Sequence, residues 1–130
     1  MILGIAQHVI RGWRRHDHRY PVPPSANRYW RHYRGRVVAS DEAQRYKQTV
    51  AMLARCSGVR PLSGPVAVEV AVYRARRAGD LDNFLKVLCD ALQGVFYDND
   101  AQIREIHATL HDDRHDPRVE VTVQSARAAT

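Results

Sequence analysis

The sequence lacks an apolar run long enough to cross a membrane, and it has few cysteines. The apolar opening Met1–Ala6 is short, and arginines from Arg11 onward stand where a signal peptide needs small residues. Only Cys56 and Cys89 are present, each beside apolar residues, which favours two reduced core thiols over a disulfide. We therefore expect a cytoplasmic protein without a membrane partner.

The sequence also has no zinc-binding pattern, internal repeat or low-complexity tract. The seven histidines lack the cysteine or glutamate spacing of a zinc site, so we expect no zinc. With 130 residues the chain fits one domain, which buries roughly two-thirds of the surface that the unfolded chain exposes.

Charge of one sign is in excess. The formal net charge is +6 and the sequence pI is about 9.8, mostly because of arginine, whose planar fork pairs well with phosphate. A polyanion is a natural partner, although a basic surface that is merely solvated explains the charge alone equally well. A motif is needed to choose between these interpretations.

The first third of the chain has little regular periodicity. Residues 1–20 mix apolar and basic stretches and are interpreted as an N-terminal arm. The prolines of residues 21–27 predict a rigid extended loop, because proline fixes φ and restricts the residue before it. A basic aromatic run follows at residues 28–36, and residues 125–130 are interpreted as a tail.

The remaining segments, residues 21–124 being taken as one domain, predict an α+β fold. Ser40 is a plausible N-cap for a helix over 41–56, and alternating valines predict a half-buried strand over 66–74. Apolar residues at helical spacing predict an amphipathic helix over 82–95. Residues 102–111 and 118–124 are interpreted as the strands of a hairpin. We expect a mixed or antiparallel sheet with the two helices packed on it.

Two aspartates stand where the valine strand leads into the second helix. Asp82 suits the N-cap of that helix, and for an isolated pattern of this kind the cap interpretation is favoured. The cap interpretation leaves Asp80 without a role. Lys86 follows Asp82 by one helical turn, where it could support the helix through an ion pair or contact a phosphate oxygen.

A second acidic group, Asp98 to Asp100, follows the second helix. Such residues are usually solvated turn formers. If the strand near Gln102 pairs beside the valine strand, we expect Asp100 to lie at the same end of the sheet as Asp80. Mg²⁺ prefers oxygen ligands and keeps several waters, so two or three carboxylates and a DNA phosphate would suit it.

Three separated stretches resemble the RusA family of Holliday junction resolvases, which are small endonucleases borne by phages or prophages. They are Pro23–Tyr29, Gly79–Lys86 with Asp90–Leu92, and Asp98–Ile103, and their order and approximate spacing match the family from about residue 20 to 124. Many members have an aspartate where Asn99 stands here.

The resemblance implies a homodimer that binds four-way junction DNA by shape and nicks two opposed strands during DNA recombination and repair. It implies Mg²⁺ held by Asp80, Asp82 and Asp100, with Lys86 as the active-site lysine. We assign DNA contacts to six residues of the basic run, of the proline motif and of the segment before the aspartates: Asn27, Arg28, Arg31, Arg74, Arg76 and Arg77.

Two other functions fit the same composition. The chain could be a binding module whose basic aromatic run 28–36 grips branched or single-stranded DNA without cutting it. It could also be a nuclease that acts on other branched DNA, such as flaps or replication forks. The binding module leaves the aspartates unexplained, since carboxylates near DNA weaken binding unless a cation neutralises them.

Overall fold

The chain is described here by a computed structural model, which places residues 18–25, 28 and 30–126. Its elements in chain order are β1 (Arg19–Tyr20), β2 (Trp30–Tyr33), β3 (Arg36–Ala39), α3 (Asp41–Cys56), β4 (Val66–Arg74), α4 (Leu81–Leu92), the short 3₁₀ helix η2 (Asp100–Gln102), β5 (Ile103–Asp112) and β6 (Arg118–Ser125). The expected strand over 66–74 and helix over 41–56 are confirmed at both ends.

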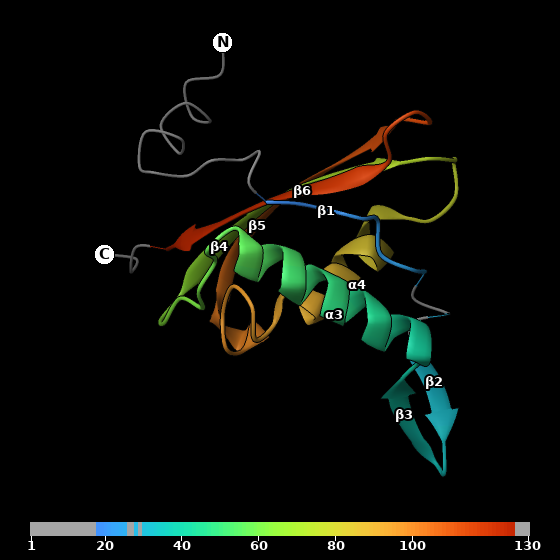
Figure 1. Cartoon of the computed structure of the whole chain (residues 1–130), viewed down its shortest axis with the longest axis horizontal. Helices are drawn as coiled ribbons and strands as arrows, with labels where there is room; N and C mark the ends of the chain where they lie inside the picture. Colours follow the sequence, from blue (N-terminus) through green and yellow to red (C-terminus); the bar gives the residue numbers. More distant parts are fainter. Residues whose placement is uncertain (1–17, 26–27, 29, 127–130) are drawn as a thin grey trace.

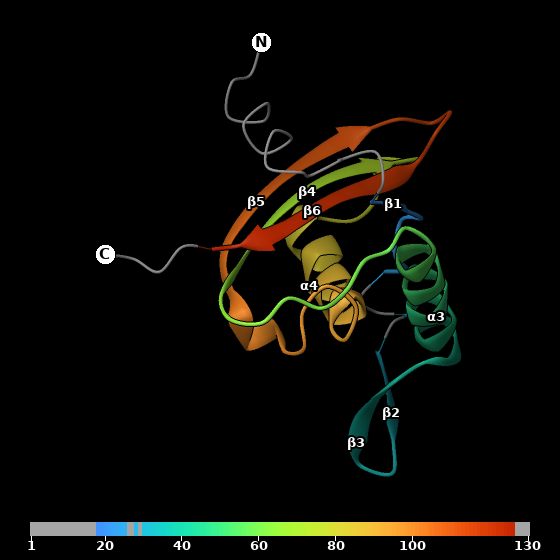
Figure 2. The ribbon, with the colours of Figure 1, turned by 60° about the vertical axis from the view of Figure 1, so that its left-hand side comes forward.

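The main sheet has the strand order β1-β6-β4-β5, with β4 parallel to β5 and antiparallel to β6. Figures 1 and 2 show both helices on one face of this sheet. The valines at alternate positions of β4 point toward the helices and are 0–2% exposed. The expected α+β fold, a mixed sheet with two main helices, is confirmed.

The expected hairpin of the last two strands is wrong, because β4 lies between β5 and β6. The burial of β4 explains the difference. Its valines are buried on the helix side and Ala71 is 6% exposed on the other, so this strand suits an interior position in the sheet. Residues 113–117 therefore cross the end of β4, joining Asp112 beside Arg74 to Arg118 beside Tyr73.

Helix α3 begins where the sequence predicts it. The Ser40 hydroxyl accepts a hydrogen bond from the Ala43 amide at 3.1 Å and so satisfies one of the free amides of the first turn. The Tyr46 hydroxyl donates to the Pro21 carbonyl at 2.7 Å, which ties α3 to the proline segment. Burial of that hydroxyl raises the pKa of Tyr46.

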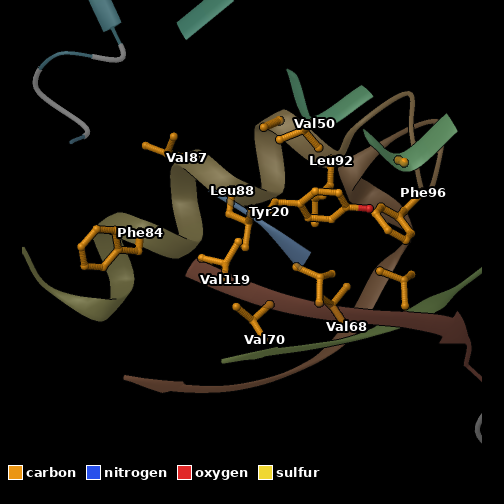
Figure 3. Packing of buried hydrophobic residues seen from close by; sticks show 14 of the residues in the cluster. Tyr20, Val50, Val68, Val70, Phe84, Val87, Leu88, Leu92, Phe96 and Val119 are labelled. Carbon is orange, nitrogen blue, oxygen red and sulfur yellow. The ribbon is translucent and has the colours of Figure 1, made fainter. Parts of the chain in front are cut away.

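Helix α4 places its apolar face on the sheet, where Phe84, Val87, Leu88 and Leu92 enter the core shown in Figure 3. The helix ends at Leu92, three residues earlier than expected, because Gln93 is extended and Gly94 has a positive φ of 84°. No helix among the described residues is both long and apolar enough to cross a membrane.

Residues 18–20 belong to the body of the fold and not to an arm. His18 and Tyr20 are 9% and 2% exposed, and both rings meet Phe96 edge to face. The His18 carbonyl accepts a hydrogen bond from the Val121 amide at 2.9 Å, beside the pairing of β1 with β6. Residues 1–17 and 127–130, which hold the rest of the expected arm and the tail, lie outside the described residues.

The basic aromatic run forms a hairpin of β2 and β3, an element that the sequence analysis does not assign. Arg34 and Gly35 both have positive φ, 51° and 75°, as the tight turns that match strand twist require. In Figures 1 and 2 the hairpin extends away from the sheet and the helices. Residues 31–37 are exposed to solvent, whereas Trp30 and Ala39 at the base of the hairpin pack against the core.

Replacing Leu88 by alanine tests the core. Leu88 is fully buried, so Leu88→Ala is expected to lower the free energy of unfolding by about 2–5 kcal/mol through lost burial and a cavity. Met52→Ala, which truncates a side chain 55% exposed on α3, should change it by no more than about 0.5 kcal/mol. Urea unfolding measures the free energy of unfolding of both variants. Equal losses of stability in Leu88→Ala and Met52→Ala would contradict this packing.

Candidate active site

Arg74 closes the turn that joins β4 to α4. Its Nε donates to Asp112 Oδ1 at 2.6 Å, and its Nη1 donates to the Gly79 carbonyl at 2.7 Å. Gly79 has φ +91°, and a Cβ built there would lie 2.8 Å from the Phe84 ring, so only glycine fits. The turn that ends at Asp80 is therefore held in one shape.

The two aspartates of this turn are exposed at the start of α4. Asp80 is the N-cap residue, with extended backbone, but its side chain makes no capping hydrogen bond. Asp82 lies in the first turn, where a negative charge suits the helix dipole. The expectation that Asp82 is the cap is wrong, because the helix begins at Leu81. The carboxylate of Asp80 is thus not used to cap the helix.

Lys86 lies one turn further along the exposed side of α4. It forms no ion pair with Asp82, so the interpretation of this pair as support for the helix is not realised among the described residues. One turn further along the same polar side, Asp90 Oδ2 forms an ion pair of 2.9 Å with Lys47 Nζ, which ties α4 to α3. The ammonium group of Lys86 remains available to an anion beside the turn.

The loop that carries the second acidic group is held by Gln102. Its Oε1 accepts hydrogen bonds from the amides of Asp98 and Asn99, both at 2.9 Å. Its Nε2 donates to the carbonyls of Leu62 and Gly64, at 2.8 Å and 2.7 Å. One side chain therefore joins this loop to the segment that leads into β4.

Asn99 has a structural role in the same loop. It is the N-cap of η2, and its Oδ1 accepts from the Ala101 amide at 2.8 Å in a reciprocal capping arrangement with Gln102. An aspartate could accept the same bond, so asparagine here removes a charge while it keeps the cap. Asp100 stays exposed in the first turn of η2.

Asp100 and Asp80 lie at opposite ends of α4, and the expectation that they share one end of the sheet is wrong. The parallel pairing sets Ile103 beside Val66, at the far end of β4 from the turn. The Asp100 amide donates to Gln93 Oε1 at 3.2 Å, at the C-cap of α4. A helix of 12 residues spans roughly 18 Å, so one chain cannot place both carboxylates on one ion.

No group of three or more histidine, cysteine, aspartate or glutamate side chains in the described part of the chain is arranged to hold a metal ion. The structure thus brings Asp80 and Asp82 to one turn and leaves Asp100 apart. The charge of Asp100 instead acts on Cys89 and Tyr97, near the C-terminal end of α4. Burial raises the pKa of the Cys89 thiol, and the negative charge of Asp100 raises it further.

Three of the predicted DNA contacts line one cavity beside the turn. Arg28, Arg74 and Arg76 meet there around a volume of about 390 Å³. The guanidinium of Arg74 is engaged with Asp112 and the Gly79 carbonyl, and it lowers the pKa of Asp112 through a hydrogen bond. Arg74 therefore shapes the turn, while Arg76 is exposed beside it.

The other predicted contacts lie elsewhere. Arg31 lies on the hairpin, with its guanidinium carbon 5.4 Å from the centre of the Tyr33 ring, and Arg34 lies over the same ring at 5.2 Å. Arg77 is 87% exposed and 3.6 Å from Asp112. Asn27 lies outside the described residues.

Sequence reasoning missed three residues that shape the site. Asn83 and Phe84 line the cavity, and Gln102 anchors the second acidic loop. The spacing from Asn99 to Gln102 is a capping-box pattern and could have identified that anchor. The pair Arg34–Gly35 inside a run of aromatic residues similarly indicates a hairpin turn.

The fold and the turn define a small basic α+β domain that displays carboxylates beside arginines, an arrangement suited to phosphodiester chemistry. Comparison with known proteins is consistent with this class: the family model described as Endodeoxyribonuclease RusA matches residues 20–124. The chain belongs to the RusA family of endodeoxyribonucleases and is thus a hydrolase.

Curated relatives share most of their length with this chain. The crossover junction endodeoxyribonuclease rusA of Enterobacteria phage 82 is 37% identical over 106 residues, which cover 79% of this chain and 88% of the relative. The RusA proteins named in the same way from Escherichia coli strain K12 and Shigella sonnei are 36% and 35% identical over the same coverage. The resemblance found in the sequence is confirmed.

The reactivity of Cys89 tests where Asp100 lies. In a Cys56→Ala background, Asp100→Asn should speed alkylation of Cys89 by iodoacetamide, by up to a few-fold near pH 8, because loss of a nearby negative charge favours the thiolate. Asp82→Asn, the matched change at the other end of α4, should leave the rate unaltered. Equal acceleration by both variants would contradict the placement.

Proposed function

We propose that the chain is a Mg²⁺-dependent endonuclease that resolves four-way junctions in DNA recombination and repair by nicking opposed strands. The names of the relatives, which specify crossover junctions, support the substrate. The observation that carries the chemistry is the turn in which Asp80 and Asp82 stand exposed, fixed by Arg74 and next to a cavity lined with arginines.

The residues of this turn fit a magnesium ion by their chemistry. Mg²⁺ takes carboxylate oxygens and water, and the Asp80 carboxylate is not engaged in capping the helix. When bound, the ion would supply a hydroxide-like water and offset charge on the phosphate. Asp80 and Asp82 would hold it, and Asp100 would complete the set.

The neighbouring cations have separate roles. Lys86, on the exposed side of α4 after Asp82, would stabilise the charge that develops on the phosphate during attack. Arg76 would bind the flanking backbone and offset the repulsion between DNA and the carboxylates. Arg74 would act through the turn that it closes, since its donors are already engaged.

The separation of Asp100 from the β4–α4 turn is the reason for proposing a dimer. Because one chain holds these carboxylates at opposite ends of α4, Asp100 would reach the ion of a second copy. β5 is the edge strand of the sheet, and Ile106 on it is 43% exposed. Leu85 and Cys89, on the flank of α4 away from α3, are only half-buried. We infer that two copies pack along this α4–β5 edge.

A two-fold dimer of this kind suits a four-way junction. One self-complementary interface gives two identical sites related by a two-fold axis, as the two opposed strands of a junction are. Each site would combine Asp80 and Asp82 of one chain with Asp100 of the other. Paired nicks on opposed strands would follow.

Conservative substitution of the carboxylates tests the site. Asp80→Asn, Asp82→Asn and Asp100→Asn are each expected to slow nicking of a labelled synthetic junction by about 100-fold or more, because each removes a ligand charge. Asp41→Asn, in the first turn of α3, is the matched control and should cut at the normal rate. The rates are read from denaturing gels with Mg²⁺ and with EDTA.

The same assay separates the enzyme from a binding module. The Tyr33 ring, 46% exposed and flanked by Arg31 and Arg34, is a surface on which a base could stack without any cutting. Retarded bands without nicks at any Mg²⁺ concentration would favour that alternative. Cutting of flaps or forks in preference to junctions would change the substrate and keep the chemistry.

Mixing two inactive variants tests the shared site. Asp82→Asn and Asp100→Asn are each expected to cut very slowly alone, but their heterodimer contains one site with both original residues and one with neither. We therefore expect the mixture to regain nicking of a single strand per junction, without paired cuts. If both residues served one chain's site, each site of the heterodimer would lack one ligand and the mixture would stay inactive.

A further inference from the structure

The cavity beside the β4–α4 turn is lined by residues of two kinds. Val22, Pro23 and Phe84 are apolar, and Arg28, Arg76 and Asn83 contribute charged and polar groups. Its volume is about 390 Å³, within the range of roughly 300–1,000 Å³ found for pockets that bind small molecules. A lone phosphate would leave the apolar residues of the lining without a contact.

Two parts of the cavity lining are held in place by contacts within the described residues. Pro23 is buried, and the proline segment is tied to α3 by the hydrogen bond from Tyr46 to Pro21. Phe84 is 8% exposed and lies against Gly79, whose carbonyl Arg74 holds. A ligand would therefore meet a site that is already formed in part, at the proline segment and at the β4–α4 turn.

The chemistry of the cavity matches one nucleotide. A base has flat faces that apolar residues of the lining can contact, and a hydrogen-bonding edge that an amide can contact. Asn83 is exposed, and its side chain both donates and accepts. Arg28 is 67% exposed at 3.5 Å from Glu42, and exposed Arg76 makes no ion pair with any described residue, so both can turn to a phosphate.

The cavity lies beside the proposed metal ligands, and this position indicates which nucleotide would bind in it. Asn83 follows Asp82 directly, and Gly79 of the cavity precedes Asp80. We propose that the cavity binds one unpaired nucleotide of the strand being cut, next to the cleaved phosphate, and that Asn83 contacts the edge of its base. This inference rests on the proposed nuclease function and adds a specificity site to it.

Such a site discriminates branched DNA from duplex DNA. In a duplex the base must first be unpaired and unstacked, whereas at a branch point the free-energy cost of doing so is smallest. An intact duplex would bind through its phosphates without filling the cavity. The same contact makes the cutting rate depend on which base is presented.

Fluorescence of 2-aminopurine tests occupancy without cutting. The base is placed at each nucleotide near the branch of a synthetic junction in turn, and Ca²⁺ replaces Mg²⁺. We expect one position to change fluorescence on binding of the original chain. Ala78→Leu, which narrows the cavity at an exposed position, and Asn83→Ala should abolish that change. Arg60→Ala, an exposed arginine outside the cavity, should keep it.

A second readout uses cutting in Mg²⁺. On junctions that differ only in the base at that position, Asn83→Ala should reduce the spread of rates by roughly ten-fold, as loss of one base contact implies. Thermal unfolding checks that each variant is folded. A position-specific signal that survives in Ala78→Leu, or an unaltered spread of rates, overturns the cavity assignment while junction cutting stands. Failure of the original chain to cut any junction overturns the proposed function instead.

Discussion

The ion pair between Arg74 and Asp112 is the interaction on which the site depends. It joins the last residues of β4 and β5, which are register partners, and the same guanidinium holds the Gly79 carbonyl. A hydrogen bond that lowers the pKa of Asp112 keeps this carboxylate charged and paired. The end of the sheet, the start of α4 and one wall of the cavity are thus fixed together. Asp80 can remain exposed because other residues define the turn.

The direction of β5 determines where Asp100 lies relative to the β4–α4 turn. Parallel pairing with β4 places the loop of Asp100 at the far end of α4 from Asp80 and Asp82. A single chain therefore has two separate acidic groups, and neither of them contains all three aspartates. A second copy along the α4–β5 edge would join them and would make catalysis depend on the dimer. For a nuclease of branched DNA this arrangement would couple the two cuts to one symmetric complex. The cavity next to Asn83 would then decide which nucleotide lies at each site.

Local sequence signals predicted the elements well and their arrangement less well. Ser40 and the apolar spacing of residues 41–56 define a helix locally, and the alternating valines of 66–74 define a strand. Which strands become neighbours depends on burial across the whole sheet, so the placement of β5 and the end at which Asp100 lies could not be read from residue order. The capping-box spacing marks Gln102 locally, but its hydrogen bonds to carbonyls 38 and 40 residues away have no local signal.

The most direct test of the account is where a paramagnetic ion binds. Mn²⁺ takes similar oxygen ligands to Mg²⁺ and broadens the backbone amide resonances near it in an isotope-labelled chain. We predict that resonances of residues 80–83 and of residues 98–101 are lost at the same low Mn²⁺ concentration in the dimer. Loss confined to residues 80–83, with sharp resonances at 98–101, would contradict the site shared between two chains.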